Sequence, residues 1–240
     1  MSIAENVAVI RDNIALSAAQ AGRNPEEILL CAATKMNDAD AVRQAIAAGV
    51  DCCGENRVQE LTQKLSQDAY RGAPVHFIGH LQTNKVKQVV GKVDLIQSVD
   101  SLRLLEAVNR EAARQGITQN ILLEINIGKE ESKSGFSQEE IWEVLDKFPL
   151  YSNVNLQGLM AIPPILQNSG DNDKFFQEMY NLSVDITAKK SDNISMGILS
   201  MGMSDDYGSA IRCGSTMIRV GTAIFGHRNY RITGDPGISM

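Results

Sequence analysis

An alternation of short apolar runs with amphipathic segments constrains the fold of this chain more than any other feature of its sequence. The first apolar run covers residues 28–33 and is nearly continuous, which is typical of a strand buried on both faces. Further strands are predicted at residues 50–53, 75–78, 95–99, 120–126, 156–162, 194–200 and 217–225. The pattern therefore predicts eight strands of a parallel sheet.

Segments with the three-and-four spacing of an amphipathic helix separate these strands. We predict helices at residues 38–48, 57–67, 84–90, 102–115, 138–147, 173–189 and 205–213. An extra helix precedes the first strand, because Ile3, Val7 and Ile10 recur at helical steps and Gly22 ends the segment. Each predicted strand except the last is thus followed by a helix.

The order of elements defines the fold class as α/β, since a strand, a helix and a parallel strand are joined by right-handed crossovers. Eight such units in 240 residues favour a closed (β/α)8 barrel of the TIM type over an open doubly wound sheet. The glycine fingerprint of a dinucleotide site is missing after the first strand, where Thr34, Lys35 and Met36 stand. We expect one barrel domain over residues 1–226 and a short polar tail over residues 227–240.

The charge balance argues against two classes of partner. The chain has 23 Lys and Arg against 29 Asp and Glu, a formal charge of −6, whereas nucleic acids and anionic membranes favour basic surfaces. The longest apolar run, residues 28–33, is far shorter than the ~20 residues of a membrane-spanning helix. Glu5 and Arg11 interrupt the start of the chain where a signal peptide is apolar. We expect a cytoplasmic protein with no nucleic-acid or membrane partner.

The cysteines and histidines give no pattern typical of a metal site. The four cysteines lack CxxC spacing, and two of them, Cys52 and Cys53, are neighbours in the chain. His76 and His80 are spaced as metal ligands on a helix, but this segment is predicted to be a strand and its exit. We expect reduced, packed thiols and no bound metal.

Site residues of a barrel enzyme lie at the C-terminal ends of the strands. Lys35 ends the first apolar run, and desolvation there would lower the pKa of its ammonium group and leave more free amine for Schiff-base chemistry. The alternative is an ordinary strand-end lysine whose head group reaches water. Asn56 and His80 follow the second and third predicted strands in the same way.

A second candidate site follows the last two predicted strands, where many barrels hold a phosphate group. Ser200, Gly221 and Thr222 lie there, and Gly221 allows the backbone to approach an anion closely. The alternative is that the glycines only turn the chain at the barrel rim. Arg219 lies in an otherwise apolar strand and is expected to contact a ligand or a carboxylate.

Several motifs in one order resemble a single known family. They are Lys35 and the stretches 54–60 (GENRVQE), 76–85 (HFIGHLQTNK), 158–160 (GLM), 199–204 (LSMGMS) and 219–226 (RVGTAIFG). Together they resemble the pyridoxal phosphate homeostasis proteins, also called the proline synthase co-transcribed family, over essentially the whole chain. The resemblance implies a barrel like the N-terminal domain of alanine racemase.

The resemblance also implies that pyridoxal 5′-phosphate (PLP) is the cofactor. It places a Schiff base on Lys35, the phosphate near Ser200, Gly221 and Thr222, Arg219 by the pyridine nitrogen, and Asn56 and His80 along the ring. A cation at the pyridine nitrogen disfavours its protonation and makes the ring a weaker electron sink.

The function that the resemblance implies is therefore non-catalytic. We expect a monomer that binds PLP in vitamin B6 and amino-acid homeostasis, with apo-enzymes that need PLP as acceptors. Racemases of this fold also need a second base and a C-terminal β domain, whereas this chain ends about fifteen residues after the last predicted strand. Two alternatives stay open, a weak PLP-dependent amino-acid racemase and a Schiff-base aldolase acting on a sugar phosphate.

Overall fold

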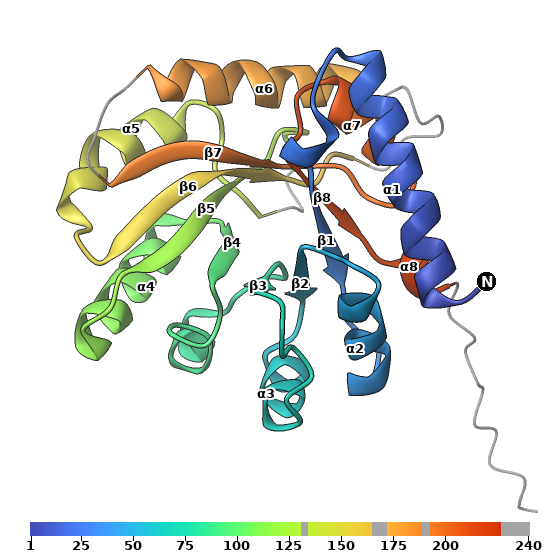
Figure 1. Cartoon of the computed structure of the whole chain (residues 1–240). Coiled ribbons are helices and arrows are strands. Elements are labelled where there is room, and N and C mark those ends of the chain that lie inside the picture. The colour runs from blue at the N-terminus through green and yellow to red at the C-terminus, as the bar shows by residue number, and fades with distance from the viewer. Residues whose placement is uncertain (131–133, 165–171, 189–192, 227–240) are drawn as a thin grey trace, which may run out of the picture.

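The computed structural model describes residues 1–130, 134–164, 172–188 and 193–226, and the structural statements below concern these residues. Within them, eight strands form a closed parallel barrel in sequence order (Figure 1). The strands are β1 (Leu29–Ala33), β2 (Cys52–Glu55), β3 (Val75–Phe77), β4 (Leu95–Val99), β5 (Gln119–Ile125), β6 (Val154–Ala161), β7 (Ile194–Ser200) and β8 (Met217–Val220). The predicted (β/α)8 barrel is confirmed. The predicted tail, residues 227–240, lies outside the described residues.

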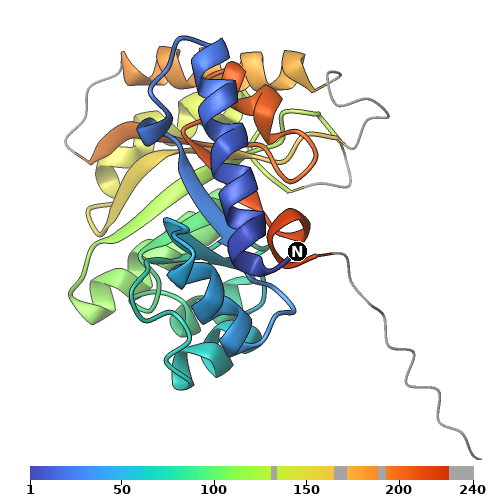
Figure 2. The ribbon, with the colours of Figure 1, turned by 45° about the vertical axis from the view of Figure 1, so that its right-hand side comes forward.

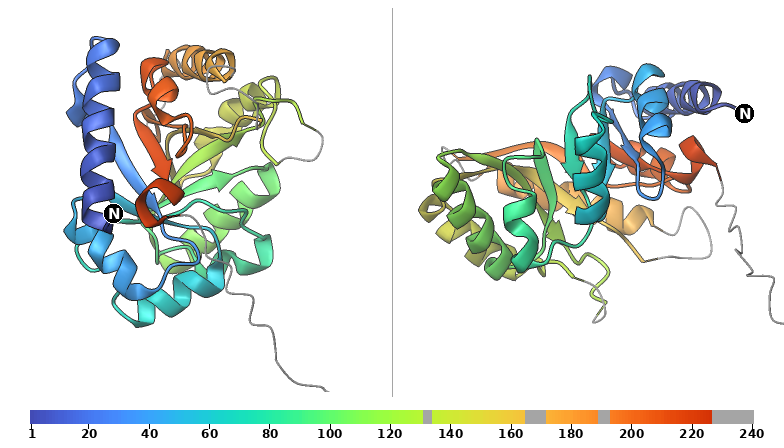
Figure 3. Two further views of the ribbon diagram at one scale, coloured as in Figure 1. Left: turned by 90° about the vertical axis from the view of Figure 1, so that its right-hand side faces the viewer. Right: turned by 90° about the horizontal axis from the view of Figure 1, so that it is seen from below.

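The helices lie around the outside of the strands, as Figure 3 shows from two directions. The α-helices are α1 (Ile3–Gln20), α2 (Ala39–Ala47), α3 (Val58–Ser66), α4 (Leu102–Gln115), α5 (Glu140–Lys147), α6 (Asp173–Thr187), α7 (Tyr207–Arg212) and α8 (Thr222–Phe225). Three short 3-10 helices are η1 (Pro25–Glu27), η2 (Thr83–Gln88) and η3 (Phe148–Leu150). None of the described helices is both long and apolar enough to cross a membrane.

One predicted α-helix, over residues 84–90, is the 3-10 helix η2 instead. Its backbone bonds close after three residues, since Lys85 N–H donates to the carbonyl of Gln82 and Val89 N–H to that of Val86. Gly91 then turns the chain with a φ of 74° towards β4. The short segment between β3 and β4 is thus used as a tight connector.

The last predicted strand, over residues 217–225, was too long. β8 ends at Val220, and after Gly221 the chain forms the short helix α8, in which Ile224 and Phe225 donate to the Gly221 carbonyl. The eighth strand therefore also has a helix after it. The apolar run continues through both elements because Ile224 is buried in the outer core, where Asn6 of α1 donates to its carbonyl at 2.8 Å.

The extra N-terminal helix is confirmed as α1, which packs along α7 and α8 beside the junction of β1 and β8 (Figure 2). Ser2 and Glu5 form a capping box at its start. Val7, Ile10 and Ile14 are buried on its inner face. The helix thus covers the place where the first and last strands close the barrel.

Two small apolar clusters are separate from the large core between strands and helices and lie in the barrel interior. One contains Cys31, Cys52 and Met217, and the other contains Leu95, Leu122 and Met160, with Ile198 packed against both. A Cβ atom on Gly54 would lie 2.9 Å from the Cys31 sulfur. The missing side chain at Gly54 therefore lets this thiol sit in the interior.

Candidate functional site

Lys35 lies two residues beyond the end of β1 and is half-buried, as the sequence predicts for a residue at the C-terminal end of the barrel. The next residue, Met36, adopts a left-handed φ of 62°, and its N–H donates to the Glu60 carboxylate at 2.6 Å. The turn that carries Lys35 is therefore held from the start of α3.

A buried polar cluster supports this turn from behind. Glu55 at the end of β2 is fully buried and forms an ion pair with Lys64 of α3. Thr34 donates its hydroxyl to Glu55 at 2.6 Å, and Lys64 donates to the Thr34 carbonyl at 2.7 Å. A buried charge pair needs such additional hydrogen bonds to offset desolvation. The cluster thus joins the strand ends that precede Lys35 and Asn56.

Asn56 has an acceptor atom that its own fold leaves unused. Its Oδ1 atom is buried, and no described residue donates a hydrogen bond to it. A Cβ on Gly79 would lie 2.2 Å from the Asn56 carbonyl oxygen, so the loop after β3 packs directly against this residue. Since buried polar atoms are generally paired, this oxygen is a candidate for contact with a ligand.

Arg219 of β8 is almost fully buried and donates to two neutral oxygens. Its guanidinium group contacts the hydroxyl of Ser200 at 2.7 Å and the carbonyl of Ala161 at 2.9 Å. These two partners are neutral oxygens and not the carboxylate that was one of the two expected partners, and contact with a ligand stays a prediction. Ser200 in turn donates to Gln97 at 2.7 Å, so its side chain lies inside the barrel with Arg219.

Gly221 and Thr222 lie at the start of α8, next to the end of β1. A Cβ on Gly221 would lie 3.5 Å from the Cβ and the carbonyl oxygen of Ala33. Ser204 reaches the same helix, and its hydroxyl accepts from the Ala223 N–H at 3.4 Å. The loop after β7 and the turn after β8 therefore meet close to the strand that leads to Lys35.

His80 follows β3 and contacts Asp100, which follows β4, with 2.9 Å between Nδ1 and Oδ2. The His80 side chain is 62% exposed, whereas that of Asp100 is only 8% exposed. His80 is thus an exposed side chain beside the strand ends, in contact with a carboxylate that is largely buried.

Glu124 near the end of β5 is a candidate functional residue that sequence reasoning missed. Burial, and then the charge of Asp100, raises the pKa of Glu124 to about 7, while Arg219 acts in the opposite direction. The feature of the sequence that could have revealed it is an acidic residue near the end of an otherwise apolar strand. Titratable groups with such shifts are concentrated at functional sites.

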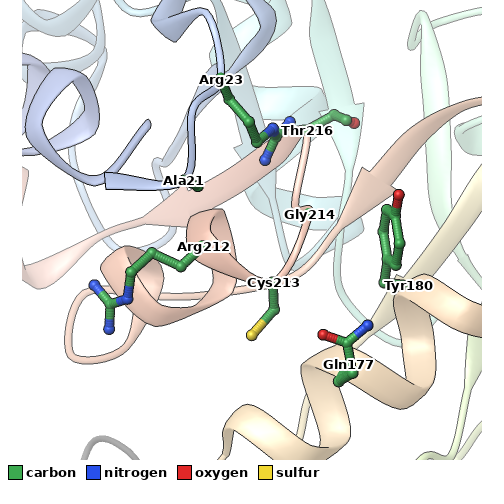
Figure 4. Close-up of a pocket in the computed structure, with 8 residues that line it drawn as sticks. All are labelled: Ala21, Arg23, Gln177, Tyr180, Arg212, Cys213, Gly214 and Thr216. Atoms are coloured by element: carbon green, nitrogen blue, oxygen red, sulfur yellow. The ribbon is translucent and has the colours of Figure 1, made fainter. Parts of the chain in front are cut away.

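A separate pocket of about 500 Å³, whose lining residues are drawn in Figure 4, is formed at the end of the barrel where the strands begin. Arg23 and Thr216, which line it, precede β1 and β8 respectively. Arg23 donates to the carbonyls of Ile211 and Ser215, both at 2.8 Å, so its cation holds the chain around α7. This pocket does not contain the predicted site residues.

The geometry defines a (β/α)8 barrel with a lysine at the end of β1 and polar groups at the ends of β2, β7 and β8. The family model for the alanine racemase N-terminal domain matches residues 6–229. The pyridoxal phosphate homeostasis protein of Escherichia coli strain K12 is 38% identical over 95% of this chain and 97% of its own length. The chain therefore belongs to the alanine racemase N-terminal domain family and, within it, to the pyridoxal phosphate homeostasis proteins.

Two solved structures are similar over nearly the whole chain. An unknown protein from Bifidobacterium adolescentis is 38% identical with a TM-score of 0.87, covering 93% of this chain and 94% of that one. PipY of Synechococcus elongatus, solved with PLP bound, is 31% identical with a TM-score of 0.81, covering 94% of this chain and all of that one. These likenesses agree with the observed barrel and its N-terminal helix.

Proposed function

We propose that this chain binds PLP at the C-terminal end of its barrel and acts in PLP homeostasis without catalysing a reaction of its own. The observation that carries the proposal is Lys35, which is half-buried at the end of β1 and lies on a turn held by the buried Thr34–Glu55–Lys64 cluster. The family of the chain and the PLP-bound structure of PipY support the same cofactor.

The residues present fit this cofactor. PLP carries an aldehyde, a phenolic oxygen and a phosphate, and Lys35 supplies the primary amine that an aldehyde requires. Asn56 has a buried oxygen with no donor among the described residues. Gly221 and Thr222 present backbone at a turn where Gly221 has no side chain to hinder an anion. We assign Lys35, Asn56, His80, Ser200, Arg219, Gly221 and Thr222 to the cofactor.

Arg219 determines what the site can do. When bound, PLP supplies an aldehyde that reacts with amines and a ring that withdraws electrons. A guanidinium group only donates hydrogen bonds, so Arg219 favours an unprotonated ring nitrogen. Ser200 and the Ala161 carbonyl hold that guanidinium in place. The ring is therefore a weak electron sink here, which fits a binding protein better than a racemase.

Ser200 acts through Arg219 in this proposal. Its hydroxyl already accepts from Arg219 and donates to Gln97. We therefore assign it to the arginine and its end of the cofactor, and we assign the phosphate mainly to Gly221 and Thr222. The sequence analysis expects Ser200 near the phosphate, whereas its hydrogen bonds to Arg219 and Gln97 favour a position near the ring nitrogen.

The Lys35→Ala variant tests the proposal. Purified wild-type protein, saturated with PLP and then desalted, is expected to keep a visible absorption band, and Lys35→Ala is expected to lose it because the attacking amine is gone. Borohydride reduction followed by peptide mass spectrometry should place the added mass on Lys35. Lys92→Ala, at an exposed lysine, is the matched control and should behave as wild type.

Two outcomes of this experiment would contradict the proposal. One is a wild-type protein that retains no PLP after desalting, and the other is a modified lysine other than Lys35. The role in homeostasis extends the proposal to acceptors. Desalted, PLP-loaded wild type mixed with an apo-enzyme that requires PLP should restore its activity.

A further inference from the structure

Three ligand-bearing side chains converge inside the barrel, below the proposed PLP site. Cys31 of β1, Cys52 of β2 and His76 of β3 each offer one ligand atom, and the three atoms lie within 4.8 Å of one another. All three residues are buried, with Cys31 fully so. Among the described residues, these three side chains form a cluster whose ligand atoms are of the right kind and close enough to hold a metal ion.

The strand register explains why these atoms meet. Cys31 and Cys52 are paired in the parallel ladder between β1 and β2, and β3 adds His76 from the next strand. Thiolate–metal bonds of about 2.3 Å place the ligands of a three-coordinate ion about 4 Å apart. The three ligand atoms, which lie within 4.8 Å of one another, must therefore move closer together by less than about 1 Å to bind such an ion.

Outer groups already orient the histidine. The Gln97 amide lies 2.9 Å from His76 Nδ1 and donates to the sulfur of Met217 at 3.1 Å. Gln97 is itself held by Ser200. Metal-binding histidines typically have such a partner on their second nitrogen. We therefore assign Nε2 as the ligand atom. When the metal binds, the ring proton lies on Nδ1 and the Gln97 amide turns, so that its oxygen accepts this proton and its NH2 group donates to the Ser200 hydroxyl instead of to Met217.

The surrounding charges favour a monovalent cation. Arg219 is paired with Cys31 in the ladder between β8 and β1, and its hydrogen bonds to the described residues reach the neutral oxygens of Ser200 and Ala161. Two thiolates and one monovalent cation carry a net charge of −1, which Arg219 balances. A divalent cation would make the metal site neutral, so that it no longer offsets the charge of Arg219. Thiolate ligands next to the thioether of Met217 also select soft metals.

We propose that Cys31, Cys52 and His76 form a buried site for Cu⁺. Binding forms two Cu–S bonds and one Cu–N bond, releases the proton of each thiol that is still protonated, and moves the imidazole proton from Nε2 to Nδ1. No electron is transferred, because copper enters and stays as Cu⁺.

The test uses the full, reduced chain without PLP, so that its result is independent of the proposed cofactor. Under anaerobic conditions the protein is titrated against a coloured Cu⁺–chelator complex. One equivalent of Cu⁺ is expected to pass to wild type. Cys31→Ser, Cys52→Ser and His76→Gln should each bind more than about 100-fold more weakly, since even the loss of an outer partner costs 10–100-fold.

Two cysteines provide matched controls. Cys53→Ala changes the neighbouring buried thiol, which packs in the outer core instead of the interior, and Cys213→Ala removes the partly exposed thiol. Both should bind Cu⁺ as wild type does. X-ray absorption spectroscopy at the copper edge of loaded wild type should show two sulfur neighbours and one nitrogen neighbour. This measurement does not depend on the folding of any variant.

The proposal fails if wild type takes up no Cu⁺ or if it binds Zn²⁺ but not Cu⁺. It also fails if Cys53→Ala weakens binding as much as Cys31→Ser, or if the double variant Cys31→Ser/Cys52→Ser keeps the wild-type affinity. Circular dichroism of each variant shows whether a loss of binding reflects a loss of fold.

Discussion

Two ionisable side chains near the C-terminal end of the barrel lie in surroundings that oppose their charge. Burial lowers the pKa of Arg219, and burial together with Asp100 raises the pKa of Glu124 to about 7. The two groups attract each other, but the hydrogen bonds of Arg219 go to Ser200 and Ala161. Glu124 thus carries its proton over much of the acidic pH range and is a titratable group near the proposed site.

The Glu124→Gln variant measures this shift. The folded chain holds the Glu124 proton up to pH about 7, whereas the unfolded chain releases it near pH 4.5. The free energy of unfolding therefore contains a contribution that falls as the pH rises from about 4.5 to about 7. Urea denaturation at pH 5 and pH 8 should show that Glu124→Gln gains stability relative to wild type at the higher pH.

A matched control for this effect is Glu143→Gln, which changes an exposed carboxyl on α5. Its stability relative to wild type should depend little on pH between the same limits. A Glu124→Gln variant that behaves like Glu143→Gln would show that Glu124 titrates as an ordinary carboxyl group.

Among the elements, β6 shows how closely two strands of the barrel approach. The register between β6 and β7 shifts between Leu156 and Gly158. Gly158 has a φ of 151°, and a Cβ placed on it would lie 1.7 Å from the carbonyl oxygen of Ile198. Only glycine fits where the backbone is both strained and in contact with its neighbour.

The Gly158→Ala variant is expected to be destabilised by at least about 2 kcal/mol, because the methyl group must displace the backbone of β7. Gly197→Ala on β7 itself is the control, since a Cβ there meets no atom within 4 Å. It should stay within about 1 kcal/mol of wild type. Urea denaturation of both variants tests this, and equal stabilities would contradict the strand contact.

At the scale of the whole molecule, the chain is a closed barrel, and the surface of its described residues gives little sign of a subunit interface. Among the described residues, its large exposed apolar side chains are spread over several elements, with at most two on any one helix, as for Val9 and Leu16 on α1 and for Tyr180 and Val184 on α6. Single exposed apolar residues are normal on the surface of a monomer. The net charge of −6 also disfavours self-association.

We therefore predict that the chain is a monomer of 26.2 kDa both with and without PLP. Sedimentation velocity at several protein concentrations, at physiological and at low salt, checks this mass. A mass that doubles with concentration in either state would show a self-association surface that the described residues do not reveal.

Sequence periodicity was enough for the barrel, because a strand buried on both faces and a helix with one apolar face leave different patterns along the chain. The positions of Lys35 and Arg219 were also predictable, since each is a cation at or near the end of an apolar run. Periodicity did not show where β8 ends and α8 begins. Ile224 of α8 packs in the outer core, so the apolar run of the strand continues into the helix.

The sequence by itself thus determined the fold class, the order of its elements and the strand ends at which the candidate PLP residues lie. Only the tertiary structure decided which side chains from different strands and helices meet. Glu55 pairs with Lys64, Arg219 with Ser200, and Cys31 with Cys52 and His76. The physical reason is that strand register and barrel closure place side chains from separate strands in contact, and spacing along the chain carries no record of that distance.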